Sequence, residues 1–156
     1  MNEVTIYTDG ASQGNPGPGG YGVVMMAGSK RLELSQGFRK TTNNRMELLG
    51  VIAALEALKK RDLNIAIYSD SKYVVDSVSK GWVFRWKKKG FKDKKNADLW
   101  RRFLELYPQQ KIKFHWVKGH ADNAMNERCD VLAVEAAHTQ PLLIDAGYEL
   151  SAVSGQ

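Results

Sequence analysis

Two aspartates, Asp9 and Asp70, each stand at the carboxyl end of a short run of apolar and aromatic residues. The runs 4–10 and 64–70 are rich in β-branched and aromatic residues, which predicts two buried strands. If the strands are parallel neighbours, their ends lie about 5 Å apart, and open α/β sheets form sites beyond the carboxyl ends of their strands. Either aspartate alone fits a turn cap equally well, but two such units in one chain favour a shared site.

Two further acids, Glu47 and Asp130, fall on apolar faces of predicted helices. The apolar residues of 44–60 recur at helical spacing, and Glu47 lies on their stripe. Asp130 shares the core face of a predicted helix over 126–137 with residues such as Val134. A carboxylate among core positions is costly unless its charge is compensated. For Glu47 alone, stabilisation by the helix macrodipole is the alternative explanation.

These four acids define the expected chemistry. Four converging carboxylates repel one another, so that without a counter-charge some of them must bind protons. A divalent cation resolves the conflict, and a ligand set made only of carboxylate oxygens selects Mg²⁺ or Mn²⁺ over zinc. Two such ions about 4 Å apart can activate a water and stabilise the leaving oxygen of a phosphodiester. The residues therefore predict a metal-dependent nuclease.

Positive charge is concentrated in one stretch. Seven cations and one acid between residues 85 and 95 account for the whole net charge of +6. A charge run is usually a solvated face, but the stretch 81–95 that contains this one also carries four aromatic residues, Trp82, Phe84, Trp86 and Phe91. Lysines suit phosphates, and flat rings suit sugars or bases. We therefore expect a basic loop at about 81–96 that binds a nucleic-acid backbone.

Length and composition limit the class of protein. A chain of 156 residues with 43% hydrophobic and 26% charged residues is typical of one soluble globular domain. No window approaches the roughly 18 apolar residues of a membrane span, and no leader precedes the first predicted strand, so we expect a cytoplasmic protein without membrane contact. The single Cys129 excludes an internal disulfide, a structural zinc site has no ligand spacing, and a buried structural role is commoner for such a cysteine than a nucleophilic one.

The predicted elements form an α/β fold with a five-stranded mixed sheet, in which an antiparallel meander is joined by parallel strands and flanked by helices. The expected order is strands 4–10, 21–27 and 32–38, helix 44–60, strand 64–70, helix 71–80, the basic loop, helix 97–107, strand 111–118 and helix 126–137.

Five segments, taken in order, resemble bacterial type I ribonuclease H. They are Thr8-Asp9-Gly10, residues 15–22 (NPGPGGYG), residues 42–48 (TNNRMEL), Ser69-Asp70-Ser71, and the stretch from Trp116-Val117-Lys118-Gly119-His120-Ala121 to Asn126-Glu127-Arg128-Cys129-Asp130. The likeness covers nearly the whole chain in order and ends with the tail segment Asp145-Ala146-Gly147-Tyr148. It implies the ribonuclease H-like fold and hydrolysis of the RNA strand of an RNA/DNA hybrid, leaving 5′-phosphate and 3′-hydroxyl ends.

The resemblance also implies roles for individual residues. The metal-binding acids are Asp9, Glu47, Asp70 and Asp130, and His120 corresponds to a loop histidine that assists proton transfer and product release, which suits an imidazole that titrates near neutrality. Residues that line the hybrid's minor groove, where the 2′-hydroxyl distinguishes RNA from DNA, are Gly10, Asn15, Asn43 and Asn44. Those implied on the DNA side are Lys40, Thr42 and Asn96 in a phosphate pocket and Trp82 against a deoxyribose. The basic loop adds Trp86, Lys87, Lys88 and Lys89.

The chain departs from the family pattern in three places. The basic loop is shorter than in the fullest versions, Lys72 stands where Gln is frequent, and Asp122 adds an acid beside His120. We expect these changes to alter affinity and pH dependence but not the type of reaction.

The expected organisation is a single catalytic domain over 1–138 with the basic protrusion, followed by a partly packed tail over 139–156 whose end is mobile. We expect a monomer that uses Mg²⁺, with Mn²⁺ as a substitute, and that acts on RNA/DNA hybrids. Two other functions fit the sequence. One is a related-fold DNA resolvase or integrase-like nuclease, which would not need amides around Asn43 to recognise the 2′-hydroxyl. The other is a non-catalytic basic nucleic-acid-binding module, whose acids are only caps.

Overall fold

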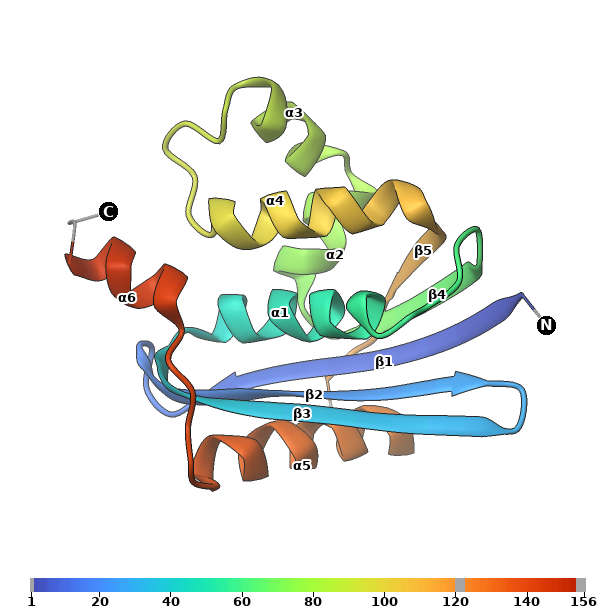
Figure 1. Ribbon diagram of the computed structural model, residues 1–156, viewed down its shortest axis with the longest axis horizontal. Coiled ribbons are helices and arrows are strands. Elements are labelled where there is room, and N and C mark those ends of the chain that lie inside the picture. Colours follow the sequence, from blue (N-terminus) through green and yellow to red (C-terminus); the bar gives the residue numbers. More distant parts are fainter. Residues whose placement is uncertain (1, 120–122, 154–156) are drawn as a thin grey trace.

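The structure is a computed structural model that describes residues 2–119 and 123–153. Its strands form one five-stranded sheet, and its helices pack around that sheet (Figure 1). In chain order they are β1 Glu3–Ser12, β2 Gly17–Ala27, β3 Lys30–Thr41, α1 Asn43–Glu56, β4 Asn64–Ser69, α2 Lys72–Ser79, α3 Trp82–Lys88, α4 Ala97–Leu106, a short 3₁₀ turn η1 Tyr107–Gln109, β5 Lys111–Trp116, α5 Ala124–His138 and α6 Ala146–Val153.

The sheet has the strand order β3-β2-β1-β4-β5. β1 pairs antiparallel with β2 and β2 with β3, whereas β1 and β4, and β4 and β5, are parallel. The predicted mixed sheet is therefore confirmed, including the parallel contact between the two strands that carry Asp9 and Asp70. β1, however, does not end at Asp9, because Asp9 pairs with Gly22 and the ladder continues to Ser12.

Strand β2 begins at Gly17, four residues before its predicted start at residue 21, and so includes several glycines. Gly19, Gly20 and Gly22 all pair with β1, although glycine is a poor strand former. Helix α5 explains Gly20 and Gly22, because a Cβ at Gly22 would stand 2.3 Å from the Cys129 carbonyl oxygen and a Cβ at Gly20 would stand 2.6 Å from that of Ala133. The missing side chains let α5 lie directly on the sheet.

Helices cover both faces of the sheet (Figure 1). Helices α1, α2 and α4 lie on one side and α5 on the other. Helix α1 packs on β1 and β2, and the core beneath it and α4 includes the fully buried Trp100 and Phe103. Asp9 and Glu47 thus approach each other from a strand and a helix that share this packed interface.

Side-chain caps set the starts of the helices. Thr42 Oγ1 accepts from the Arg45 backbone N–H at the start of α1, and Asn123 Oδ1 accepts from two N–H groups at the start of α5, which is the usual role of these residues at N-caps. Helix α1 ends at Glu56, four residues before the predicted end at residue 60, because the Leu58 N–H bonds to the Leu55 carbonyl in a tighter i to i+3 turn.

The basic stretch corrects the sequence prediction. Residues 82–88 form helix α3 and not a loop, and Phe91 is buried at 6% exposure. Phe84 and Trp86 also pack against the core. Phe84, Trp86 and Phe91 therefore anchor the stretch to the domain, and the buried Phe91 is not available to stack on a sugar or base.

The tail contains structure that the sequence prediction missed. Phe38 and Leu143 form a parallel bridge, and the two backbones exchange hydrogen bonds beside β3. Helix α6 follows. Leu143 and Ile144 remain about half exposed, so backbone pairing holds this segment more than burial does. Among the described residues, no helix is both long and apolar enough to cross a bilayer.

Candidate active site

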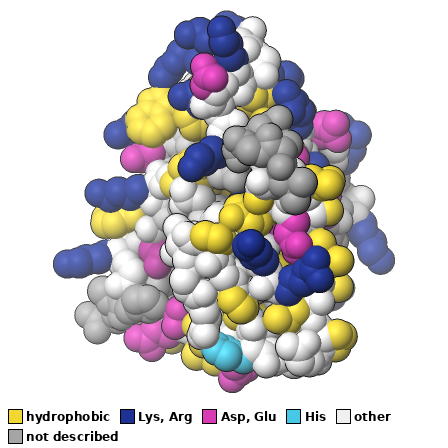
Figure 2. Space-filling view, turned by 90° about the vertical axis from the view of Figure 1, so that its left-hand side faces the viewer, with side chains coloured by type: hydrophobic (Ala, Val, Ile, Leu, Met, Phe, Trp, Pro, Cys, Tyr) yellow, Lys and Arg dark blue, Asp and Glu magenta, His cyan; other side chains and the backbone are white. Residues whose placement is uncertain are grey.

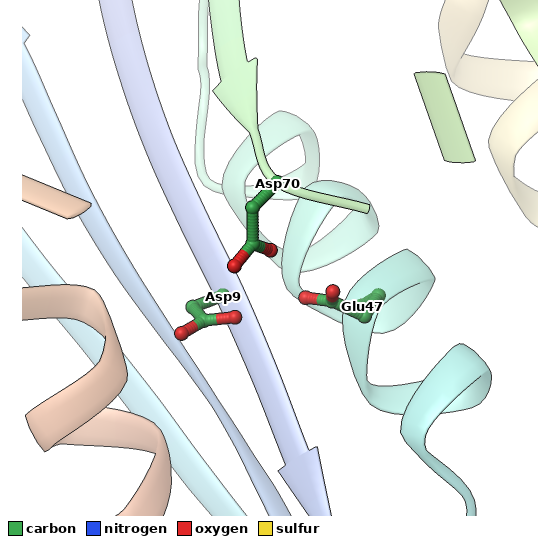
Figure 3. A group of neighbouring side chains, drawn as sticks. All are labelled: Asp9, Glu47 and Asp70. Atoms are coloured by element: carbon green, nitrogen blue, oxygen red, sulfur yellow. The ribbon is translucent and has the colours of Figure 1, made fainter. Parts of the chain in front are cut away.

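Three of the four predicted acids come together at one point of the sheet (Figure 3). Asp9 projects from β1, Asp70 follows β4, and Glu47 reaches toward both from α1. One carboxylate oxygen of each lies within 4.8 Å of the other two. Parallel pairing of β1 with β4 brings the two aspartates together, as the sequence analysis expects.

Gly10 lets the helix bring Glu47 to this point. A Cβ at Gly10 would stand 2.4 Å from the Glu47 amide nitrogen, closer than any side chain tolerates. The Gly10 N–H also donates to Asp9 Oδ1 at 2.9 Å. Glycine after Asp9 therefore has a steric reason, which is the close approach of α1 to β1.

The site carries more negative charge than its surroundings accommodate. Burial, and then the nearby Asp70 carboxylate, raise the pKa of Asp9 to about 8. Burial, and then Asp9, raise the pKa of Glu47 well above its ordinary value. Glu47 Oε1 is buried without a hydrogen-bond partner among the described residues. An unpartnered buried acceptor beside two carboxylates fits a divalent cation, and the all-oxygen donor set matches Mg²⁺ or Mn²⁺.

The fourth acid, Asp130, lies at the edge of this group. It is half-buried on α5 and is not one of the three acids that converge within 4.8 Å, but its charge contributes to the raised pKa of Asp9. The predicted core face of this helix is only partly confirmed, since Val134 is 39% exposed. Cys129 beside it is buried and donates to the Tyr7 carbonyl, and burial raises the pKa of its thiol to about 12, which excludes a ready nucleophile.

His120 and Asp122 lie outside the described residues. The residue before them, Gly119, is held beside Asp70, where a Cβ would stand 2.9 Å from Asp70 Oδ2. Trp116 Nε1 donates to the Asp70 backbone carbonyl at 3.1 Å. The chain therefore passes beside Asp70 at Gly119, directly before His120 in the sequence.

The predicted groove-reading amides gather beyond the end of β1. Asn43 Oδ1 accepts from both the backbone N–H and the hydroxyl of Ser12, and the Asn43 N–H donates to Asn15 Oδ1 at 3.1 Å. Asn44 is exposed beside them. Three exposed amides thus lie next to Gly10, in a network that fixes the orientation of Asn43.

The residues predicted for a phosphate pocket converge on Arg45. Thr42 Oγ1 accepts from its backbone N–H, and Asn96 Oδ1 accepts from its Nη1 at 3.3 Å. Lys40 is exposed on β3 nearby in sequence. The structure therefore connects Thr42 and Asn96, which are distant in sequence, through one residue: Thr42 bonds the backbone N–H of Arg45, and Asn96 bonds its guanidinium.

Exposed cations gather around α3. Figure 2 shows Lys and Arg side chains crowded at the top of the molecule, where α3 lies in Figure 1. Lys87, Lys88 and Lys89 are exposed, and Trp82 is half-buried at the start of the helix. Trp86 meets Trp100 edge to face at 6.1 Å, so it is more an anchor than a free stacking surface.

Sequence reasoning missed several residues of this region. Ser12, Tyr73 and Asp98 gave no local signal, because their hydrogen bonds reach partners far along the chain. Asp145 is part of the family likeness and accepts locally from the Tyr148 N–H, but its contacts with Arg45 and Thr41 could not be predicted along the chain. Arg45 did give one, since a cation stands on an apolar helix stripe. Lys72, noted only as a departure from the family pattern, lies over the Trp116 ring at 4.7 Å.

Comparison with known proteins agrees with this geometry. The RNase H family model matches residues 1–138. The chain is 55% identical to ribonuclease H of Syntrophus aciditrophicus over 95% of this chain and 88% of that relative. Among solved structures it is similar to LC9-RNase H1, a type 1 RNase H with the type 2 active-site motif (33% identity, TM-score 0.79, covering 97% of this chain and 82% of that one).

A second structural relative was solved with a ligand. LC11-RNase H1, in complex with an RNA/DNA hybrid, is 28% identical to this chain, with a TM-score of 0.60 over 86% of this chain and 96% of that one. The match of the family model includes β1, α1 and α5, which carry Asp9, Glu47 and Asp130, and β4, which ends directly before Asp70. The chain therefore belongs to the RNase H family.

Proposed function

We propose that this protein is a divalent-metal-dependent endonuclease that hydrolyses the RNA strand of RNA/DNA hybrids, leaving 5′-phosphate and 3′-hydroxyl ends. The convergence of Asp9, Glu47 and Asp70, with Glu47 Oε1 buried and unpartnered among the described residues, carries the proposal. Membership of the RNase H family and the hybrid bound to LC11-RNase H1 support the choice of substrate.

Asp9, Glu47 and Asp70 are the residues that hold the metal, with Asp130 completing the set from α5. When bound, two Mg²⁺ ions supply an activated water and charge stabilisation at the scissile phosphate, and Mn²⁺ is a chemically reasonable substitute. Asp9 and Glu47 must lose protons to serve as ligands, so binding releases protons near neutral pH. We assign His120 to proton transfer at the leaving group.

Substrate discrimination falls to the groups around the acids. Asn15, Asn43 and Asn44, together with the Gly10 backbone, are suited to donors and acceptors in a shallow minor groove, where the 2′-hydroxyl marks the RNA strand. Lys40, Thr42 and Asn96 form the DNA-side phosphate pocket, and Trp82 packs on a deoxyribose. The cations of α3 supply sequence-independent attraction to the backbone. A monomeric state and a cytoplasmic location stay predictions from the sequence.

The function is tested with four labelled duplexes of one sequence: RNA/DNA, RNA/RNA, DNA/DNA, and DNA with one ribonucleotide. Each is incubated with Mg²⁺ and with EDTA. We expect Mg²⁺-dependent cleavage of the RNA strand in the hybrid alone. Cleavage of DNA/DNA instead would favour a resolvase-like nuclease.

A variant separates catalysis from binding. Asp9→Asn should bind the hybrid without cleaving it, because the amide weakens the metal site and leaves the basic surface intact. A non-catalytic binding module predicts no change in any activity for this variant.

Neutralising Lys87, Lys88 and Lys89 together should weaken binding and reduce the salt slope by up to about 2.7, since each phosphate contact contributes about 0.9. An unchanged slope would remove α3 from the binding site.

A further inference from the structure

Asn96 begins helix α4 in an unusual way. Its backbone is in the left-handed region, with φ 64°, and its side chain makes no capping hydrogen bond. Asparagine tolerates this backbone and is normally a good N-cap. Here the amide is used elsewhere, because Oδ1 accepts from Arg45 and Nδ2 donates to the Tyr73 hydroxyl at 3.1 Å.

These two neighbours fix which end of the amide faces outward. A guanidinium only donates, so Arg45 requires the oxygen of Asn96 on its side. Tyr73 OH also accepts from Trp100 Nε1 at 2.8 Å, and therefore stays in place beside the buried indole. Nδ2 carries two hydrogens and Tyr73 takes one. One N–H of Asn96 is left for an anionic ligand.

Every N–H group of the Arg45 guanidinium has an acceptor. Its Nε and Nη2 donate to the Asp145 carboxylate at 2.8 and 3.0 Å. Nη2 and Nη1 donate to the Asp98 carboxylate at 2.6 and 2.9 Å, and the remaining Nη1 hydrogen faces Asn96. The five N–H groups of the guanidinium thus meet five contacts, and its side chain is only 4% exposed.

Asp145 ties this arrangement to the tail of the chain. Asp145 is 7% exposed. It also accepts, at 2.7 Å, from the Oγ1 of Thr41, which is the last residue of β3. Gly147 makes the close packing possible, since a Cβ there would stand 2.0 Å from Asp98 Oδ2. Lys40 and residues of α6, Tyr148 among them, border a cavity of about 240 Å³, so α6 lies beside Lys40.

We propose that Asp145, in the segment beyond the part matched by the family model, is a positioning residue for binding of the DNA strand. It acts through Arg45 to orient the Asn96 amide toward a backbone phosphate, and Tyr73 holds the amide from the other side. This inference rests on the proposed function, because it deepens the role assigned there to Asn96. It predicts that the tail contributes to substrate affinity although it does not touch the acids.

The first test separates affinity from turnover. Asp145→Ala should raise KM for the hybrid about tenfold and change kcat less than about twofold, because the loss of charge-assisted hydrogen bonds frees the Asn96 amide. Tyr73→Phe should raise KM about threefold. Glu105→Gln is the control: Glu105 is exposed near the end of α4, the helix that Asn96 begins, so KM should equal that of the unmodified protein.

The second test places the effect at one phosphate. A panel of hybrids carries a single uncharged methylphosphonate at successive positions of the DNA strand. In the unmodified protein and in Glu105→Gln, one position should raise KM at least about fivefold. In Asp145→Ala and in Tyr73→Phe the penalty at that position should fall below about twofold, since a misoriented amide no longer senses the charge.

Three results would overturn the inference. One is a full methylphosphonate penalty in both variants. Another is a fall in kcat at unchanged KM. The third is an effect of Asp145→Ala that adds fully to that of Asn96→Ala. If Asp145→Ala fails to fold by circular dichroism, Asp145→Asn, which keeps the size of the side chain and removes its charge, decides by the same KM and methylphosphonate measurements. Absence of any hybrid cleavage by the unmodified protein would refute the proposed function itself, and is thereby distinguished from these outcomes.

Discussion

Two residues on the first turns of one helix, Arg45 and Glu47, lie in opposite electrostatic surroundings. Arg45 is surrounded by the carboxylates of Asp98 and Asp145, and its charge is matched from within the chain. Glu47 lies among acids, with one buried oxygen unpartnered among the described residues. Two positions along α1 separate them, and side chains two residues apart point to different sides of a helix.

The pKa values of the carboxylates in the two regions show which negative charges the chain compensates by itself. Around Arg45, hydrogen bonds from the guanidinium hold the pKa of Asp98 below its usual range, although burial alone would raise it. Around Glu47, burial and like charges raise pKa values. The Arg45 network therefore supports structure, while the acid cluster gains from a cation supplied from outside.

The largest expected effect removes one acid. Glu47→Gln should lower Mg²⁺-dependent hybrid cleavage at least about a thousandfold, equivalent to about 4 kcal/mol, and raise the melting temperature in EDTA because a buried like charge is gone. Glu56→Gln on the same helix is the control, because Glu56 is exposed and pairs with Arg102. A melting temperature that falls in Glu47→Gln would contradict the contrast.

The converse variant disrupts the compensated region. Arg45→Met should lower the free energy of unfolding by about 3–5 kcal/mol, because buried Asp145 loses its partner. Thermal or urea unfolding measures the loss. Arg39→Met, which breaks the exposed pair with Glu149, should cost far less stability, because solvent screens that pair. Equal losses in the two variants would show that burial does not distinguish the pairs.

The next largest expected effect is stabilisation of the folded protein by Mg²⁺, which should depend on the acid cluster and not on the Arg45 network. At a concentration 100 times its Kd, Mg²⁺ should raise the free energy of unfolding by about 2.7 kcal/mol, measured as a higher melting temperature at matched ionic strength. Asp70→Asn should lose most of this shift, while Arg45→Met should keep it from a lower starting point. A shift lost equally in Arg45→Met would mean that the two regions are not independent.

The smallest effect is on pH dependence, and its sign differs between the regions. With a pKa of about 8 against an ordinary 3.8, Asp9 binds more protons in the folded state between those values, so in EDTA its contribution to stability falls as pH rises toward 8. Asp98 behaves oppositely and loses its contribution as pH falls through its lowered pKa.

Asp9→Asn tests the first sign. Because an amide does not titrate in this range, the variant should flatten the fall in the free energy of unfolding between pH 5 and 8. Unfolding at several pH values in EDTA measures it, and a parallel pH profile for Asp9→Asn and the unmodified protein would refute the assignment.

Much of the fold could be predicted because its signals are local. Alternation and helical spacing placed all five strands and the helices α1, α2, α4 and α5, with ends displaced by a few residues. Helix α3 was missed because its dense lysines looked like a solvated loop, and the buried side of Trp86 and Phe91 is visible only against Trp100 and Arg101. Helix α6 was missed because its position depends on Asp145.

Residue type and spacing alone determined the candidate acids, since carboxylates at strand ends and on apolar helix stripes are anomalies that can be recognised along the chain. Only the tertiary structure decided which acids stay uncompensated. Arg45 meets Asp98 and Asp145 across 53 and 100 residues of sequence, whereas Asp9, Glu47 and Asp70 meet one another. Charge compensation depends on distances of a few ångströms, and such distances between remote residues exist only after the chain has folded.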